Sequence, residues 1–413
     1  MIAEILCVGT ELLLGDIVNT NAQYLSKRLA EIGVSVYHQT VVGDNEERVK
    51  EAYDLAFSRA DIVINTGGLG PTKDDLTKEM ACAYFNKKLV LHEDILENLE
   101  KCFEKMNKPM PPNNKKQAYF PEGGIMIPNH NGTAPGCIIN ENNKIVVLLP
   151  GPPTEMKPMF EETVVPYLSK FSDGVLHSKV LRIMGIGESG AEEKIKDIIE
   201  SQKNPTIAPY AKSGEMIFRI TSKGKDLEEA KKLIEPMESE LRKRFGEDIY
   251  GEGEETSIEE VVAKLLLEKH LTIATAESCT GGMVAARLIN YPGISEVFMD
   301  GAVTYSNEAK MNRLGVKKET LDNYGAVSPQ VAEEMALGIA KTSNTNVGIS
   351  TTGIAGPGGG SEEKPVGLVY IAVAINGKVI NKKLNINGTR EYIRIRATLC
   401  LLDALRRELL HLS

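Results

Sequence analysis

Ser278 stands where a strand pattern gives way to a helix pattern. Residues 271–276 contain β-branched side chains and precede a Ser-Cys-Thr-Gly-Gly turn, and residues 283–289 are apolar at helical spacing. A strand-to-helix corner exposes a small side chain above a sheet, and N–H groups at the start of a helix can stabilise an anion. The pattern indicates a serine nucleophile beside an oxyanion hole. An ordinary capped turn is the alternative.

Lys310 lies at a second corner of the same kind, Val303–Lys310, where Ser306 or Asn307 is the expected helix cap. The lysine falls in the first helical turn, where the partial positive charge of the helix disfavours a cation. Desolvation there would lower its pKa from the ordinary value of about 10.4, and a neutral amine is a base. A protonated surface lysine is the alternative.

These two corners belong to a longer series of motifs. AESCTGG and YSNEAK are followed by GAVS at residues 325–328, TGIAGPGGGSEEKPVG at residues 352–367 and an Arg-x-x-x-Arg helix start near the end. In this order the motifs resemble the C-terminal domain of the CinA family of competence/damage-inducible proteins. The resemblance implies a nicotinamide-nucleotide amidohydrolase, which converts nicotinamide mononucleotide to nicotinate mononucleotide and ammonia without a cofactor.

The resemblance also assigns roles to individual residues. Ser278 is the counterpart of the nucleophile, Lys310 of the general base, and Tyr305 of a residue that orients the others or relays protons. Substrate binding is expected from the turn, the Gly-rich loop and the arginine pair, namely Thr280, Gly281, Gly282, Thr352, Gly353, Gly356, Arg390 and Arg394. One helical turn separates the two arginines, which suits a bidentate grip on phosphate, with surface ion pairing as the alternative. A flexible connection is the alternative for the Gly-rich loop.

The first part of the chain alternates strand patterns with helix patterns. Strands are expected at residues 2–8, 34–42 and 61–65, and helices at 21–32 and 46–57, which predicts a doubly wound, mainly parallel sheet. Ligands collect beyond the carboxyl ends of such strands. The expected ligand-binding residues there are Gly9, Thr10, Gly67, Gly68 and Asp75, and the candidate metal ligands are Asp75, Asp74, Asp44, Glu11 and Glu155. Helix capping is the alternative for Asp74 and Asp75.

Three motifs of this part carry a resemblance of their own. TGGLGPTKDDLT at residues 66–77, NGTAPG at 131–136 and LPGPPTEM at 149–156 resemble the N-terminal domain of the CinA family, itself similar to molybdopterin-binding domains of the MoaB/MogA type. Asp75 matches the catalytic aspartate of those relatives, whereas Leu69 stands where they usually have threonine, which argues against a pterin. The resemblance instead implies hydrolysis of the pyrophosphate in ADP-ribose with a divalent metal (Mg, Mn or Co).

The middle of the chain is expected to form a small α+β domain. Residues 180–184 and 216–221 read as strands and 227–245 as a helix, and Gly187–Gly190 matches the GxxG of KH-type RNA-binding modules, as in the KH-like middle domain of the CinA family. An excess of acidic residues and few aromatic ones argue against RNA and favour a spacer or interface. The predicted domains are therefore residues 1–170 (MoaB/MogA-like), 171–253 (KH-like) and 254–413 (α/β amidohydrolase).

Composition limits the remaining choices. A chain of 413 residues favours two or three domains, and a net charge of −9 opposes nucleic-acid binding. Six cysteines without metal-binding spacing, no apolar run long enough for a bilayer and an acidic N-terminus predict a cytoplasmic protein with no membrane partner. We expect a homodimer acting on small nucleotides. The alternative is a non-catalytic nucleotide-binding or regulatory protein linked to competence or DNA damage.

Overall fold

The computed structural model describes residues 1–105, 107–171, 174–212 and 214–412. By its internal contacts the chain divides into two compact units: Met1–His177 with Ser222–Leu233, and Ser178–Thr221 with Ile234–Ser413. Within the described ranges, none of the helices combines the length and the apolar character needed to cross a bilayer. The three predicted domain boundaries stay predictions.

The first unit contains a six-stranded mixed sheet in the order β2-β1-β3-β8-β7-β6, counted over the described residues. Its parallel strands are β1 (Ile2–Val8), β2 (Ser35–Val42), β3 (Ile62–Thr66) and β8 (Lys144–Leu149), and its antiparallel edge is β7 (Gly136–Glu141) and β6 (Ile125–Ile127). The predicted strands at residues 2–8, 34–42 and 61–65 are confirmed, with shifts of one residue at some ends. The mainly parallel sheet is confirmed as well.

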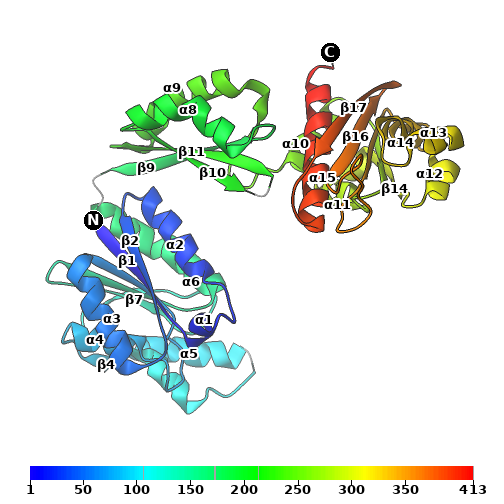
Figure 1. Cartoon of the computed structure of the whole chain (residues 1–413). Coiled ribbons are helices and arrows are strands. Elements are labelled where there is room, and N and C mark those ends of the chain that lie inside the picture. The colour runs from blue at the N-terminus through cyan, green and yellow to red at the C-terminus, as the bar shows by residue number, and fades with distance from the viewer. Residues whose placement is uncertain (106, 172–173, 213, 413) are drawn as a thin grey trace. The chain divides into compact units, whose positions relative to one another are not determined.

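Helices cover both faces of this sheet, as a doubly wound fold requires (Figure 1). On one face, α2 (Thr20–Glu31) and α6 (Pro153–Met159) share a core with Ile5 and Cys7 of β1. On the other, α3 (Glu46–Arg59) and α4 (Thr77–Tyr84) pack against Leu6 and Val8. The remaining elements are α1 (Thr10–Leu14), β4 (Leu89–Leu91), α5 (Glu93–Lys105), η1 (Pro112–Ala118), β5 (Tyr119–Pro121), η2 (Phe160–Val164), α7 (Val165–Leu168) and η3 (Ser169–Phe171).

The middle of the chain forms a four-stranded sheet in the order β10-β11-β9-β12, again over the described residues. Its strands are β9 (Val175–Ile183), β10 (Thr206–Lys212), β11 (Glu215–Gly224) and β12 (Ile249–Glu252), and its helices are α8 (Glu188–Ser201), α9 (Leu227–Phe245) and η4 (Gly246–Asp248). Residues of α8 and α9 pack with the strands in one apolar core. The predicted α+β class and the helix at 227–245 are confirmed, whereas β10, β12 and α8 were not predicted.

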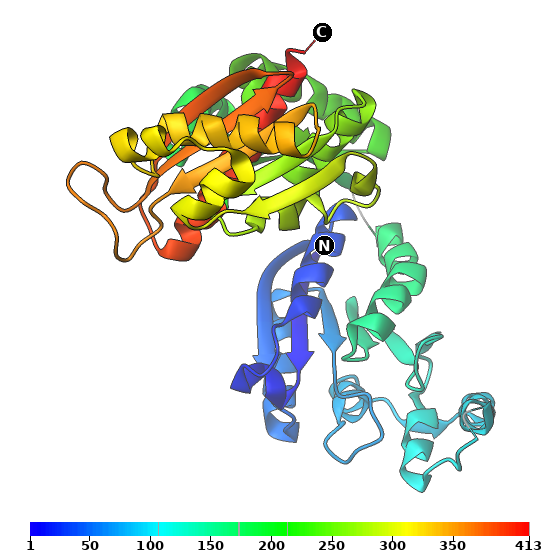
Figure 2. The ribbon, with the colours of Figure 1, turned by 90° about the vertical axis from the view of Figure 1, so that its right-hand side faces the viewer.

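The last part of the chain forms a five-stranded sheet in the order β14-β13-β15-β16-β17. Strands β13 (Ile273–Glu277), β14 (Phe298–Val303) and β15 (Val347–Gly353) are parallel, and β16 (Leu368–Ile375) with β17 (Lys378–Asn385) is an antiparallel hairpin. On one face lies α14 (Pro329–Thr342), and on the other lie α10 (Ile258–Glu268), α11 (Met283–Leu288) and α15 (Arg390–Leu410) (Figure 2). Shorter helices are η5 (Ile294–Glu296), α12 (Asn307–Leu314) and α13 (Lys318–Tyr324).

Helix α15 connects this sheet to the middle one within the second unit. Arg396 donates a hydrogen bond to the carbonyl of Gly214. Near the other end of the helix, Arg406 donates to Glu247 O at 2.6 Å and Arg407 to an Asp248 carboxylate oxygen at 2.9 Å. Charge-assisted bonds of this kind are stronger than neutral ones. One helix therefore carries contacts to both sheets of the unit.

Candidate active site

Ser278 lies at the corner between β13 and α11, as the sequence predicts. Its N–H donates to Thr351 O on the neighbouring strand β15 at 3.1 Å, and 8% of the residue is exposed. The turn closes through Gly281 and Gly282, whose φ angles of 63° and 94° lie in the left-handed region that favours glycine. The hydroxyl is thus held at the carboxyl edge of the sheet, where α/β proteins place their ligands.

Lys310 reaches Ser278 although 32 residues separate them in sequence. Its Nζ lies 3.1 Å from Ser278 Oγ, and donates to Thr304 O at 2.9 Å and to Tyr305 O at 3.4 Å. Ser306 caps α12 by accepting from Ala309 N at 3.0 Å, as predicted. Since only 1% of Lys310 is exposed, the surface-lysine alternative is wrong.

Burial, more than the set of contacts, favours a neutral Lys310, because its three oxygen neighbours would equally accept the three hydrogens of an ammonium group. Burial lowers the pKa of Lys310 below its ordinary value, because a cation loses its hydration there. A neutral amine keeps two N–H bonds and gains a lone pair. The carbonyls of Thr304 and Tyr305 can accept those two hydrogens, so that the lone pair faces the hydroxyl of Ser278. This is the arrangement of a nucleophile beside its base.

Cys279, next to Ser278, is not placed to act as the nucleophile. The residue is 5% exposed, and burial raises the pKa of its thiol to about 11. The thiolate, rather than the thiol, attacks carbonyl carbons, and this environment suppresses it near neutral pH.

A buried carboxylate occupies the start of α11. Glu277, 1% exposed, accepts from Gly282 N at 2.9 Å, Val284 N at 3.1 Å and Ala285 N at 2.9 Å. Gly282, one of the expected substrate-binding residues, thus has its backbone N–H already used by Glu277. We expect any oxyanion contact to come from the turn before it, at Cys279, Thr280 and Gly281. Sequence reasoning missed Glu277, because it ends strand β13 and five residues separate it from the first residue of α11.

We expect Glu277→Gln to destabilise the protein and to slow turnover without removing it. The amide keeps the size of the side chain but replaces one acceptor oxygen by an NH₂ group facing backbone N–H donors, which costs about 2 kcal/mol of unfolding free energy. A displaced Ser278 should lower kcat by about 10-fold or more with little change in KM. Denaturant unfolding and steady-state kinetics measure both. Glu319→Gln, in the exposed first turn of α13, is the matched control and should change neither.

The two predicted phosphate-binding arginines contact the backbone of the site. Arg394 donates from Nε to Cys279 O at 3.1 Å and from Nη2 to Thr280 O at 2.7 Å, and so fixes the serine turn. Arg390 donates to Gly356 O in the Gly-rich loop at 2.7 Å and to the Tyr305 hydroxyl at 3.3 Å. With two donors so used, Arg394 acts first as a positioning residue. A phosphate contact from either arginine stays a prediction.

Tyr305 meets the serine–lysine pair through its backbone. Its carbonyl accepts from Lys310, whereas its side chain, in a residue that is 65% exposed, turns to Arg390. Proton relay by the phenol stays a prediction. The backbone contact helps to orient the amine of Lys310 and does not depend on the phenol.

The Gly-rich loop after β15 is tied to the GAVS motif. Thr352 Oγ1 donates to Ala326 O at 2.7 Å, and Lys364 Nζ donates to Tyr324 O at 2.6 Å and Val327 O at 2.8 Å. Thr352 and Gly353 end the strand β15 that also supports Ser278. Four motifs far apart in sequence thus meet at one edge of the sheet, and the loop is attached at both its strand end and Lys364.

A separate cavity of about 490 Å³ lies at the carboxyl edge of the first unit's sheet. Gly9, Gly67 and Gly68 line it, together with the five predicted carboxylates Glu11, Asp44, Asp74, Asp75 and Glu155. Thr10 lies outside this lining and holds Asp44 Oδ2 through its N–H at 2.9 Å and its hydroxyl at 2.8 Å.

Asp75 supports the turn in front of α4. Its Oδ2 accepts from Thr72 N at 2.9 Å and from Thr72 Oγ1 at 2.5 Å. The residue at the N-cap of α4 is Leu76, without a side-chain cap bond, so capping by Asp74 or Asp75 is not what the structure shows.

The carboxylates of this cavity have the oxygen donors that a hard cation prefers, but they are not already grouped around one point. Their oxygen atoms are the donors that Mg²⁺ prefers. Among the described residues, however, no three His, Cys, Asp or Glu side chains are grouped closely enough to hold a metal by themselves. Mg²⁺ commonly takes one or two carboxylates and completes its shell with water and substrate phosphates, and the donors present fit that mode.

The fold and the site define a multidomain α/β protein whose last sheet carries a serine–lysine pair. Residues 255–409 match a family described as "CinA C-terminal domain", residues 4–170 one described as "Probable molybdopterin binding domain", and residues 178–251 the "Damage-inducible protein CinA KH domain". The chain belongs to the CinA family of competence/damage-inducible proteins. The predicted family and fold class are confirmed.

Relatives match along the whole chain. A competence-damage inducible protein of Clostridium acetobutylicum is 63% identical over 412 residues and covers 100% of both chains. One from Clostridium perfringens strain 13 is 64% identical over 410 residues, covering 99% of each. The crystal structure of the competence/damage inducible protein CihA from Agrobacterium tumefaciens is 41% identical, covers 38% of this chain and 99% of that one, and has a TM-score of 0.36.

Proposed function

We propose that the protein hydrolyses the carboxamide of nicotinamide mononucleotide to nicotinate mononucleotide and ammonia. The observation that carries this proposal is the contact of a buried lysine amine with Ser278 Oγ at 3.1 Å, while two carbonyls accept the remaining hydrogens of the amine. A serine hydroxyl is a weak nucleophile until a neighbouring base takes its proton. The resemblance to the CinA amidohydrolase domain supplies the substrate.

The proposed reaction has two steps. Ser278 Oγ attacks the carboxamide carbon while Lys310 accepts the hydroxyl proton, and N–H groups of the turn at 279–281 stabilise the oxyanion. Lys310 returns the proton to the nitrogen, the C–N bond breaks and ammonia leaves an ester on Ser278. Lys310 then takes a proton from water, and hydroxide attacks the ester carbon. The bond between that carbon and Ser278 Oγ breaks, Lys310 returns the proton to Oγ, and nicotinate mononucleotide is released.

The test is direct release of both products. We expect purified full-length protein to release ammonia and nicotinate mononucleotide in equal amounts from nicotinamide mononucleotide in the presence of a metal chelator. No release from a folded sample would contradict the proposal and favour a regulatory role linked to competence or DNA damage, which the names of the relatives suggest.

A second candidate activity is metal-dependent hydrolysis of the pyrophosphate in ADP-ribose by the first unit. The observation that favours it is the convergence of five carboxylates and a glycine-rich loop on one cavity. A divalent metal there would neutralise the phosphates and polarise the bond to be cleaved. Asp75 and Asp44 would help to hold that metal, and the backbone at Gly67 and Gly68 would allow close approach of a phosphate.

Asp75→Asn should reduce Mg²⁺-dependent ADP-ribose hydrolysis by about 100-fold or more, because it removes a charge from the metal-binding group. Phosphate-ester products measured with and without chelator give the readout. Asp54→Asn, an exposed aspartate on α3, is the control and should keep full activity. The amidase should be unchanged in both variants. Equal hydrolysis by wild type and Asp75→Asn would exclude this role.

A further inference from the structure

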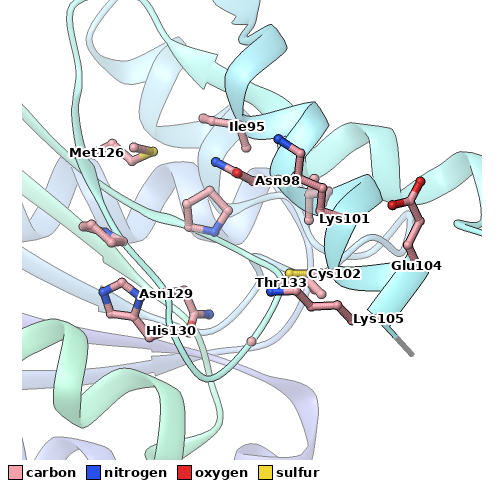
Figure 3. A pocket seen from close by; sticks show the side chains of 14 residues that line it. Ile95, Asn98, Lys101, Cys102, Glu104, Lys105, Met126, Asn129, His130 and Thr133 are labelled. Carbon is pink, nitrogen blue, oxygen red and sulfur yellow. The ribbon is translucent and has the colours of Figure 1, made fainter. Parts of the chain in front are cut away.

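The first unit has another cavity, of about 500 Å³, between α5 and the segment 126–135, called here the α5 cavity. Figure 3 shows Asn98 and Lys101 of α5 facing Met126, Asn129 and His130 across it. Its volume is that of a small-molecule site. No predicted site residue lines it, so it is distinct from both sites described above.

The lining of the α5 cavity divides into an apolar part and a cationic part. Ile95, Leu99, Met126 and Pro135 give the apolar surface, on which a flat aromatic ring can lie. Lys105, near the end of α5, and Thr133 line the same cavity. An ammonium group and a hydroxyl can each bind a phosphate oxygen.

The polar groups of the cavity are not equally free to bind a ligand. Lys101 lies 3.5 Å from Glu97, and Asn129 donates to Glu155 at 2.7 Å and to Ala134 O at 2.9 Å. The carboxamide of Asn98 has no hydrogen-bond partner among the described residues, and it offers both a donor and an acceptor to a ring edge. Lys105, Asn98 and His130 are therefore groups that can contact a ligand.

The α5 cavity is less acidic than its neighbour. Two lysines, of which Lys101 is paired with Glu97, and one carboxylate, Glu104, line it, whereas five carboxylates and, among the described residues, no lysine or arginine line the glycine-rich cavity. Thr133 lines both cavities, so the two share a wall. Without a metal, an anion is repelled less on the α5 side than in the glycine-rich cavity.

We propose that the α5 cavity binds a nucleoside monophosphate, with the base on the apolar surface beside Asn98 and the phosphate at Lys105 and Thr133. The inference rests on neither proposed activity, because occupancy needs no turnover. Cys102 lines the same cavity and is partly exposed, which provides a local probe.

The test uses full-length protein carrying Ser278→Ala and a chelator, with AMP as the probe. We expect AMP to bind by calorimetry and to slow maleimide alkylation of Cys102, identified by peptide mass. Adenosine and ribose 5-phosphate should each bind at least about 10-fold more weakly than AMP, since each lacks one half of the contacts.

Two variants locate the site. Lys105→Met, which removes the phosphate contact, and Asn98→Trp, which fills the cavity from an exposed position, should each weaken AMP binding about 10-fold or more. Lys50→Met, at an exposed position of α3, is the matched control and should bind AMP as tightly as the Ser278→Ala protein does. Absence of AMP binding, unchanged binding in both cavity variants, or alkylation of Cys102 at the same rate with AMP would overturn the proposal.

Discussion

Ser278→Ala is expected to lower ammonia release from nicotinamide mononucleotide by at least about 10⁴-fold, the scale seen when a hydrolase loses its nucleophile. The hydroxyl is the group 3.1 Å from Lys310 Nζ, and no covalent ester can form without it. Binding of the nucleotide should change little, because the change removes one atom from a nearly buried position. Calorimetric titration of the variant with nicotinamide mononucleotide separates binding from turnover.

Two further measurements identify the nucleophile. Acid quenching of wild type during turnover should trap a nicotinate mononucleotide ester on the peptide that contains Ser278. Cys279→Ala should keep turnover within about 10-fold, because burial keeps that thiol protonated. Wild-type turnover by Ser278→Ala, or an ester on Cys279 in place of Ser278, would refute the mechanism.

Lys310→Met is expected to reduce turnover by about 10³-fold, the usual contribution of a general base. Methionine fills similar space without a titratable amine. Lys310→Arg should be equally inactive, because a guanidinium stays protonated and cannot accept the serine proton. If the arginine variant restored turnover, the role of Lys310 would be that of a fixed positive charge, and the proposed base chemistry would fail.

The lowered pKa of Lys310 predicts a pH dependence of both activity and stability. In wild type, kcat/KM should rise with pH through an apparent pKa below the ordinary value of 10.5, since the neutral amine is the active form. Between that lowered pKa and 10.5 the unfolded chain binds more protons than the folded one, so the unfolding free energy of wild type increases with rising pH. The unfolding free energy of wild type minus that of Lys310→Met should therefore increase with pH in this window. If this difference stays flat or decreases with pH, Lys310 is not neutral in the folded protein.

Local features of the fold were predictable from the sequence. Strand β1 has the predicted ends because its apolar run stops at Gly9, and Ser306 caps its helix as predicted. Caps and strand ends depend on neighbouring residues, so a short window of sequence contains the signal. The motifs also located both corners of the serine–lysine site.

Features that depend on distant partners were not predictable in this way. Glu277 reads as the end of a strand, and only the folded turn brings three N–H groups to its carboxylate. Arg394 reads as a phosphate ligand, yet its guanidinium meets carbonyls 115 and 114 residues away in sequence. Only two of the strands of the middle sheet were predicted. A short edge strand such as β12 is stabilised by pairing with its neighbour, and its own sequence carries little signal.

Helix α15 has a consequence for dividing this chain. The middle and last modules match separate family models, yet one helix contacts both of their sheets. Arg406 is 2% exposed and would lose its Glu247 partner if the chain were cut between these modules. Because a buried guanidinium that loses an acceptor is costly, the last module of this chain, expressed alone, should be less stable than it is in the full chain.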